Sequence, residues 1–220
     1  MRSTHCRIEH NVSFRSQHRT NPRMGLCSAR WHDGQIGRVR AFEDLTSVHD
    51  LVPKAVRIAV LVNPANVLTT ETTLREIPEA ARSLGLQIQV LKARTSREIE
   101  EAFAILVRDR ADALFVAPDS FFQSRRVQFA TLTTRHAIPA TYSVREYVEV
   151  GGLMSYGTDL AEAFRQVGVY TGQILKGANP GDLPVMQSTK FEFVINLQTA
   201  RALGIEVPNS IQLLADEVIE

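Results

Sequence analysis

Cysteine is scarce in this chain, and the two that occur lie near its start. Of 220 residues only Cys6 and Cys27 are cysteine, so no disulfide framework is expected. Four of the six histidines share this region, but Cys6 with His10 and Cys27 with His32 only loosely approach the ligand spacing of structural zinc sites. We therefore expect neither a disulfide-stabilised domain nor a metal site.

Long apolar runs are also missing. A secretory signal peptide needs an unbroken apolar run of roughly 7 to 15 residues, and residues 1–42 contain none. No other window approaches the roughly 18 apolar residues of a transmembrane helix. The chain as written has no visible signal for export and would remain cytoplasmic.

Motifs for catalysis and nucleotide binding are absent as well. A dinucleotide-binding enzyme needs a Gly-x-Gly-x-x-Gly turn after its first strand so that the backbone can approach a pyrophosphate, but residues 63–69 read NPANVLT. The sequence contains no Gly-x-x-x-x-Gly-Lys-Ser/Thr loop and no Gly-x-Ser-x-Gly nucleophile elbow. We expect no enzymatic activity and no cofactor, and a Rossmann-like enzyme is kept only as an alternative.

Charge is distributed unevenly along the chain. The formal net charge is +1, yet residues 1–42 contain eight arginines, no lysine and only Glu9 and Asp33 as acids. Such a segment can bind nucleic acid weakly and without specificity, but it has too few aliphatic residues at helical spacing for a helix-turn-helix. We predict that residues 1–43 are disordered or non-native, with no specific nucleic-acid partner.

The pattern beyond residue 44 is typical of an α/β domain. Short apolar runs predict strands at 57–63, 86–91, 113–116, 140–142 and 151–157. Amphipathic stretches between them predict helices at 70–84 and about 122–135, and a third helix that follows a capping sequence at 95–98 and carries apolar residues from 99 to 107. This alternation favours a doubly wound lobe built on a mostly parallel sheet, with right-handed crossovers and helices on both faces. We assign this lobe to residues 44–158.

A strongly amphipathic helix is predicted at 159–176. Its apolar stripe consists of Leu160, Ala163, Phe164, Val167, Tyr170, Ile174 and Leu175. Residues 190–196 alternate as a strand, and 197–203 form a short helix that Gly204 ends. The stripe needs an apolar partner, because seven uncovered positions would promote association.

Several segments, in order, resemble the family of ABC-transporter substrate-binding proteins. They are residues 51–66, 118–122, 135–139, 151–157, 172–177 and 190–196. Members of this family have a type I periplasmic-binding fold, in which two α/β lobes hold a ligand in the cleft between them. The resemblance implies a periplasmic solute-binding component of an ABC-type uptake system, which takes a small amino-acid-like solute and works with an ABC transporter permease.

The resemblance also implies that part of the protein is absent. Family members begin with a signal peptide and a first lobe, and residues 1–50 show neither pattern. We therefore expect a truncated chain in which solute binding is not assured. Residues 159–220 would supply the inter-lobe helix, a crossover and a C-terminal strand and helix. Self-association through the 159–176 helix is expected.

Polar residues follow several of the predicted strands. Ligands of open parallel sheets sit beyond the carboxyl ends of the strands. On this rule we predict a ligand-binding set of Asn63, Asn66, Asp119, Ser120, Tyr142, Arg145, Ser155 and Tyr156. Asp119 could take the ammonium group of a solute and Arg145 a carboxylate.

Each of these residues also has a structural interpretation. Asn63 can close its strand with an Asx turn, and Asp119 can cap the next helix. The two tyrosines can belong to the core, and Arg145 can pair with Glu146 or Glu149. A ligand-sensing domain of a transcriptional regulator uses the same two-lobed fold and is the other alternative function.

Overall fold

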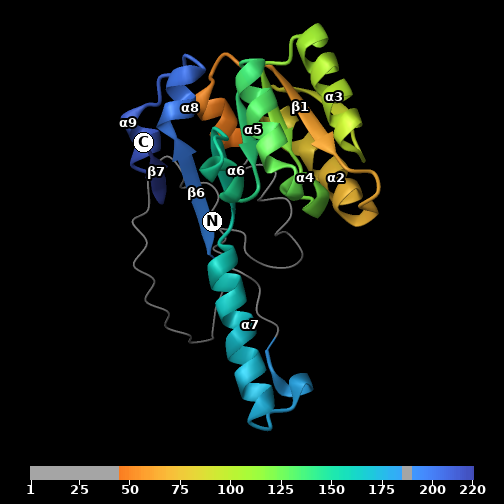
Figure 1. Ribbon diagram of the computed structural model, residues 1–220, viewed down its shortest axis with the longest axis vertical. Helices are drawn as coiled ribbons and strands as arrows, with labels where there is room; N and C mark the ends of the chain where they lie inside the picture. Colours follow the sequence, from red (N-terminus) through yellow and green to blue (C-terminus); the bar gives the residue numbers. More distant parts are fainter. Residues whose placement is uncertain (1–44, 185–189) are drawn as a thin grey trace, which may run out of the picture. The chain divides into compact units, whose positions relative to one another are not determined.

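The computed structural model describes residues 45–184 and 190–220. Within this part of the chain, one sheet has the strand order β2-β1-β3-β4-β5-β6-β7 (Figure 1). Its strands are β1 (Arg57–Val62), β2 (Gln87–Lys92), β3 (Ala113–Val116), β4 (Ala140–Tyr142), β5 (Met154–Thr158), β6 (Phe191–Asn196) and β7 (Glu217–Ile219). Strands β1 to β5 are parallel, whereas β6 is antiparallel to β5 and β7 is parallel to β6. The predicted α/β class with a mostly parallel sheet is confirmed.

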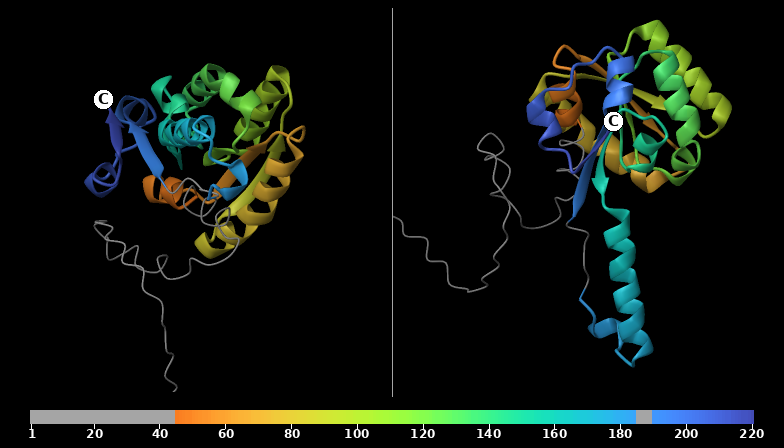
Figure 2. Two further views of the ribbon diagram at one scale, coloured as in Figure 1. Left: turned by 90° about the horizontal axis from the view of Figure 1, so that it is seen from below. Right: turned by 60° about the vertical axis from the view of Figure 1, so that its left-hand side comes forward.

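Helices connect the strands and cover both faces of the sheet (Figures 1 and 2). They are α2 (Val67–Leu84), α3 (Ser96–Asp109), α4 (Ser120–Ser124), α5 (Arg126–Arg135), α6 (Glu146–Glu149), α7 (Leu160–Leu175), α8 (Leu197–Ala202) and α9 (Asn209–Gln212). Residues 45–51 are helical as well, and Pro180–Asp182 form a short 3-10 turn. The basic segment 1–43, with its cysteines, lies outside the described residues.

Two hydrophobic clusters form the core, one on each face of the sheet. Because side chains alternate along a strand, Ile58, Val60 and Val62 of β1 join the cluster that includes α2 and α8. Ala59 and Leu61 join the other cluster, with residues of α3, α4 and α5. A strand buried on both faces has to be apolar throughout, which explains the unbroken run in β1.

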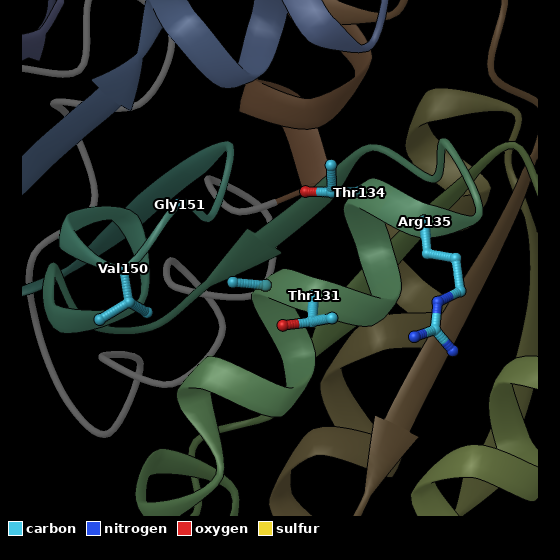
Figure 3. A pocket seen from close by; sticks show the side chains of 6 residues that line it. Thr131, Thr134, Arg135, Val150 and Gly151 are labelled. Carbon is cyan, nitrogen blue, oxygen red and sulfur yellow. The ribbon is translucent and has the colours of Figure 1, made fainter.

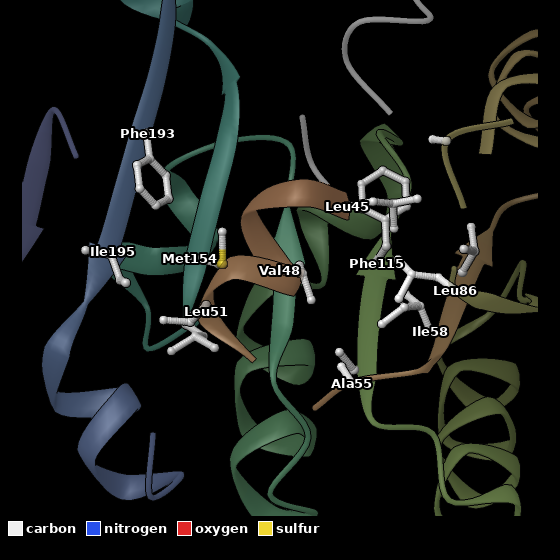
Figure 4. Packing of buried hydrophobic residues seen from close by; sticks show 14 of the residues in the cluster. Leu45, Val48, Leu51, Ala55, Ile58, Leu86, Phe115, Met154, Phe193 and Ile195 are labelled. Carbon is white, nitrogen blue, oxygen red and sulfur yellow. The ribbon is translucent and has the colours of Figure 1, made fainter. Parts of the chain in front are cut away.

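The helical segment 45–51 packs in the first of these clusters. Leu45, Val48 and Leu51 are buried at helical spacing, in the same cluster as Met154 and Phe115; Leu51 lies on the side of Met154 and Leu45 on the side of Phe115 (Figure 4). The sequence interpretation placed a boundary here without a helix. The lobe therefore includes an additional helical segment just ahead of β1.

The helix predicted at 122–135 is instead two helices, α4 and α5. The backbone of Arg125 leaves the helical conformation, with φ −105° and ψ 15°. The stretch contains neither glycine nor proline, so its sequence carries no signal for the break. The break still lets Phe122 and Phe129 pack edge-on, with ring centroids 5.5 Å apart, in one core cluster.

Helix α7 follows β5 and leads away from the sheet (Figure 1). None of its residues is buried. The chain returns to the sheet at Lys190, whose backbone carbonyl accepts a hydrogen bond of 3.1 Å from the Asp159 N–H. In the described ranges no helix combines the length and apolar character needed to cross a membrane.

Candidate functional site

The carboxyl ends of β1 and β3 meet at the point where the strand order reverses. From β1 the chain runs outward to β2, then returns to β3 on the other side of β1. At such a point two loops diverge above the sheet, and this is where ligands of doubly wound sheets bind. Asn63 directly follows β1, and Asp119 lies in the loop after β3.

Asp119 binds both asparagines that follow β1. Asn63 Nδ2 donates to Asp119 Oδ1 at 3.0 Å, and Asn66 Nδ2 donates to Asp119 Oδ2 at 3.2 Å. The backbone N–H of Phe122 also donates to Asp119 Oδ1, at 3.1 Å, which makes Asp119 the N-cap of α4. We call these three side chains, Asn63, Asn66 and Asp119, the polar cluster.

The local backbone fixes how the two amides point. Asn63 Oδ1 accepts from the Ala65 N–H at 3.0 Å, in the expected Asx turn, and Asn66 Oδ1 accepts from the Thr69 N–H at 3.4 Å as the N-cap of α2. Because the Oδ1 atoms of Asn63 and Asn66 accept hydrogen bonds from the backbone, their Nδ2 atoms point toward Asp119. The structural interpretations of Asn63 and Asp119 therefore hold, and they also orient the polar cluster.

This arrangement gives the polar cluster a defined chemistry. A carboxylate has about four acceptor positions. Three donors occupy three of those positions on Asp119, which leaves about one for a ligand. Each amide nitrogen carries a second N–H. Ser120 begins α4 beside the cluster and is exposed. A small solute with one cationic donor and several acceptors would match this set.

Arg145 lies apart from the polar cluster and has three acidic partners. It pairs through Nε with Glu149 at 2.8 Å and through Nη2 with Glu217 at 2.7 Å, and its Nη1 donates to Glu192. The hydrogen bonds that Arg145 donates to Glu149 and then to Glu217 raise the pKa of Arg145. The structural interpretation of Arg145 as a partner of Glu149 is confirmed. A solute carboxylate would have to compete with these acids.

Burial raises the pKa of Glu192, although the positive charge of Arg145 opposes that shift. Glu192 is the second residue of β6 and Glu217 is the first residue of β7, while Arg145 precedes α6. The guanidinium group therefore joins three elements that are distant in sequence. Its role in this structure is to hold them at one edge of the sheet.

Tyr142 is fully buried and belongs to the core. Its ring stacks on that of Tyr147, with centroids 4.3 Å apart and planes at 11°. Burial raises the pKa of Tyr142, and its hydroxyl lies 3.5 Å from Thr133 Oγ1. Gly152 makes room for this pair, because a Cβ atom there would lie 2.8 Å from Tyr142 Cε2.

Ser155 and Tyr156 lie within β5. Ser155 is buried opposite Val194, and the Tyr156 ring stacks on Phe191 with centroids 5.9 Å apart. The structure thus gathers Asn63, Asn66 and Asp119, with Ser120 next to them, and places the other four predicted residues elsewhere.

Tyr147 is a buried titratable residue that was not among the predicted binding residues. Burial is the largest cause of its raised pKa, and the negative charges of Asp119 and Glu146 add to it. Tyr147 belongs to the four-residue helix α6, which is too short to show a sequence period.

A shallow hollow of about 410 Å³ lies at the opposite edge of the sheet (Figure 3). It is formed where α5 ends and β5 is about to begin, and its lining residues are Ala130, Thr131, Thr134, Arg135, Val150 and Gly151. None of the predicted binding residues lines it. In the described part of the chain no group of three or more His, Cys, Asp or Glu side chains could hold a metal ion.

Comparison with known proteins gives a consistent result. A family model described as ABC transporter substrate binding protein matches residues 40–219. A Clostridioides difficile protein named tyrosine-binding protein is 26% identical over 162 residues, which cover 74% of this chain and 46% of that protein. The chain therefore spans about half the length of this curated relative.

Solved structures are similar as well. A Streptococcus pneumonia structure, titled as an ABC domain in complex with L-Trp, has a TM-score of 0.74 and 27% identity, covering 81% of this chain and 60% of that one. A LacI family transcriptional regulator from Bifidobacterium animalis has a TM-score of 0.55 and 13% identity, covering 71% and 59%. The second similarity is one of fold alone.

Proposed function

The chain belongs to the family of ABC transporter substrate-binding proteins, and on this basis we propose that it binds a small amino-acid-like solute for an ABC-type uptake system. Proteins of this family bind substrates and are not catalysts, so we propose no enzymatic activity. The regulator alternative has only a similarity of fold in its favour.

The polar cluster is the observation that carries this proposal. Asp119 sits at the switch point of the sheet, where the amides of Asn63 and Asn66 hold both of its oxygens in place. A preorganised carboxylate loses little entropy on binding, and its contact with an ammonium group is charge-assisted. We propose that Asp119 accepts from the α-ammonium group, while the remaining amide N–H groups and the Ser120 hydroxyl serve the carboxylate.

The other predicted residues have lesser roles in this proposal. Arg145 and Tyr156 could reach a solute only after rearrangement, because Arg145 is paired and Tyr156 is stacked. Tyr142 and Ser155 would support the site from the core. The cleft itself would lie between this lobe and a second lobe.

The names of the relatives favour an aromatic side chain on the solute. One relative is named as tyrosine-binding and one solved relative holds L-Trp. The family context also favours a permease as the macromolecular partner and a periplasmic or extracellular location.

A thermal-shift screen against the twenty L-amino acids tests the proposal. A ligand at about 100 times its Kd should raise the Tm by about 5–10 °C. Asp119→Asn should remove most of that shift, whereas Asp182→Asn, a change at an exposed acid outside the polar cluster, should leave it unchanged. No shift with any amino acid, or an equal shift in both variants, would contradict the proposal.

A further inference from the structure

Two cationic side chains are half-buried in residues 45–184 and 190–220, Arg126 and Arg145, whereas the other arginines and the lysines of this part of the chain are exposed. Arg145 is held by three acids. Arg126 forms no ion pair with any acid of the same residues, and its Nη1 donates to the Gln123 carbonyl at 3.4 Å. A half-buried cation without an acidic partner has lost solvation that a bound anion would offset.

We propose that Arg126 binds the α-carboxylate of the solute while Asp119 holds its ammonium group. This inference rests on the proposed function and adds a cation to the amide and hydroxyl donors of the same carboxylate. Asp119 and Arg126 together supply one negative and one positive charge, which matches a zwitterion. Arg126 was not among the predicted binding residues, because it follows no strand directly.

The path of the chain brings Arg126 to the ligand-binding edge of the sheet. Helices α4 and α5 connect β3 to β4, and these two strands are parallel. The connection therefore returns from the carboxyl end of β3 to the amino end of β4. Arg126 is the first residue of α5 and Arg135 is the last. Arg126 thus lies at the start of this return, on the side of the sheet edge that carries the polar cluster.

The Arg126 side chain turns back toward Asp119. Its hydrogen-bond acceptor, Gln123, lies three residues earlier, and the Gln123 N–H donates to the Asp119 carbonyl at 2.9 Å. Side chains of a helix tilt toward its N-terminus. The guanidinium group therefore closes part of the distance of about 10 Å that seven helical residues span.

Aromatic packing connects the same two charged residues by a second route. Phe129 lies one helical turn after Arg126 and packs edge-on against Phe122, whose N–H donates to Asp119. Tyr147 packs against Phe129, with ring centroids 6.1 Å apart and planes at 64°. Burial is the largest cause of the raised pKa of Tyr147, and the charge of Asp119 adds to it while the charge of Arg126 opposes it. Both charges therefore act on one buried phenol.

Isothermal titration with L-tryptophan and L-tryptophanamide tests the assignment, because the amide keeps the ammonium group and lacks the carboxylate. The wild-type chain should prefer L-tryptophan, and Arg126→Met should reduce that preference by about tenfold or more. Arg126→Lys keeps the charge and should retain part of the preference. Arg125→Met is the matched control and should leave the preference unchanged, since Arg125 is exposed and its guanidinium carbon lies 5.7 Å from the Phe121 ring centroid.

The ratio of the two affinities separates carboxylate binding from a structural role. If Arg126→Met weakens both compounds equally, or if Arg125→Met lowers the preference as much, the inference is overturned. If L-tryptophan binds and Asp119→Asn weakens it while Arg126→Met preserves the ratio, this inference fails and the proposed function stands. If the wild-type chain binds neither compound, both are wrong.

Urea unfolding of the ligand-free chain gives an independent check. Because Arg126 has no acidic partner in the described residues, Arg126→Met should not lower the urea midpoint, unlike Arg145→Met. A decrease as large as that of Arg145→Met would show that Arg126 has a structural role and would count against a ligand-binding one. Circular dichroism of each variant confirms that it is folded.

Discussion

Asn63 donates a hydrogen bond of 3.0 Å to Asp119, and the two residues lie 56 positions apart in the sequence. The bond joins the ends of the adjacent parallel strands β1 and β3 at the switch point of the sheet. The residues of the polar cluster therefore have both a structural role and a position suited to binding. The same contacts close a strand, cap a helix and fix a carboxylate where a ligand of this fold would bind.

Replacement of Asp119 should reveal the structural part of that role. Asp119→Ala removes the α4 cap and leaves the buried Asn63 amide without its acceptor. We expect a loss of about 2–3 kcal/mol in the free energy of unfolding by urea. Asp119→Asn keeps a cap and one acceptor oxygen, so it should lose about 1 kcal/mol. Equal losses would contradict this assignment.

Replacement of Arg145 should have an effect that depends on pH. Arg145→Met leaves Glu192 without the charge that opposes its raised pKa. An acid whose pKa is raised on folding costs stability as pH rises through that pKa. The variant should therefore lose about 1–2 kcal/mol at about pH 7 and clearly less at about pH 4.

Urea unfolding at both pH values measures this difference, and Arg97→Met is its control. The pair of Arg97 with Glu101 is exposed, with 88% and 58% of the side chains accessible. Its removal should change the stability by no more than about 0.5 kcal/mol at either pH. If the stability that Arg145→Met loses does not vary with pH, the pKa of Glu192 is not raised in the variant and this explanation is contradicted.

Two glycines should respond to alanine in opposite ways. A Cβ atom at Gly157 would lie 1.7 Å from the carbonyl oxygen of Ser143, so Gly157→Ala should cost more than about 4 kcal/mol or prevent folding. Gly172 lies in α7 with open space around it, so Gly172→Ala should raise the stability by about 0.5–1 kcal/mol. Thermal unfolding monitored by circular dichroism checks both.

Asp159 should control the first turn of α7. Its Oδ1 accepts from the Glu162 N–H at 3.0 Å and its Oδ2 accepts from Lys190 Nζ at 2.7 Å. Asp159→Ala should speed hydrogen exchange at the Glu162 amide, whereas Asp159→Asn keeps the cap and should have a smaller effect. The hydrogen bond from Lys190 is the main cause of the lowered pKa of Asp159.

The lowered pKa of Asp159 also predicts a pH dependence. An acid with a lowered pKa stabilises the fold above its ordinary pKa and loses that effect as pH falls through its folded value. Protection of the first turn of α7 should therefore persist at pH values below the ordinary range for aspartate. Loss of protection already at mildly acidic pH would contradict it.

Much of the fold could be predicted because local signals decided it. Gly85 adopts a left-handed conformation at the end of α2, and Thr95 caps α3 through the Glu98 N–H at 3.2 Å. The apolar runs of β1, β3 and β4 each fell within a residue of the observed strands. These features depend on residues close in sequence, which a single chain displays directly.

The remainder depended on contacts between distant residues. Arg145 meets Glu192 and Glu217, which lie 47 and 72 positions further along, and no local pattern announces either pair. Tyr142 is fully buried because its ring stacks on Tyr147, a residue of a different element. The polar cluster was more predictable, because the switch-point rule brings the residues after β1 and β3 together.

Isothermal titration of one solute and its deaminated analogue tests the central claim most directly. We predict that the wild-type chain binds L-tryptophan more tightly than 3-indolepropionic acid, and that Asp119→Asn reduces this preference by about tenfold or more, since a charge-assisted contact is worth about 1.5–3 kcal/mol. If both proteins bind the two compounds with the same ratio of affinities, or if neither compound binds the wild-type chain, Asp119 is not the ammonium site of an amino-acid-binding protein.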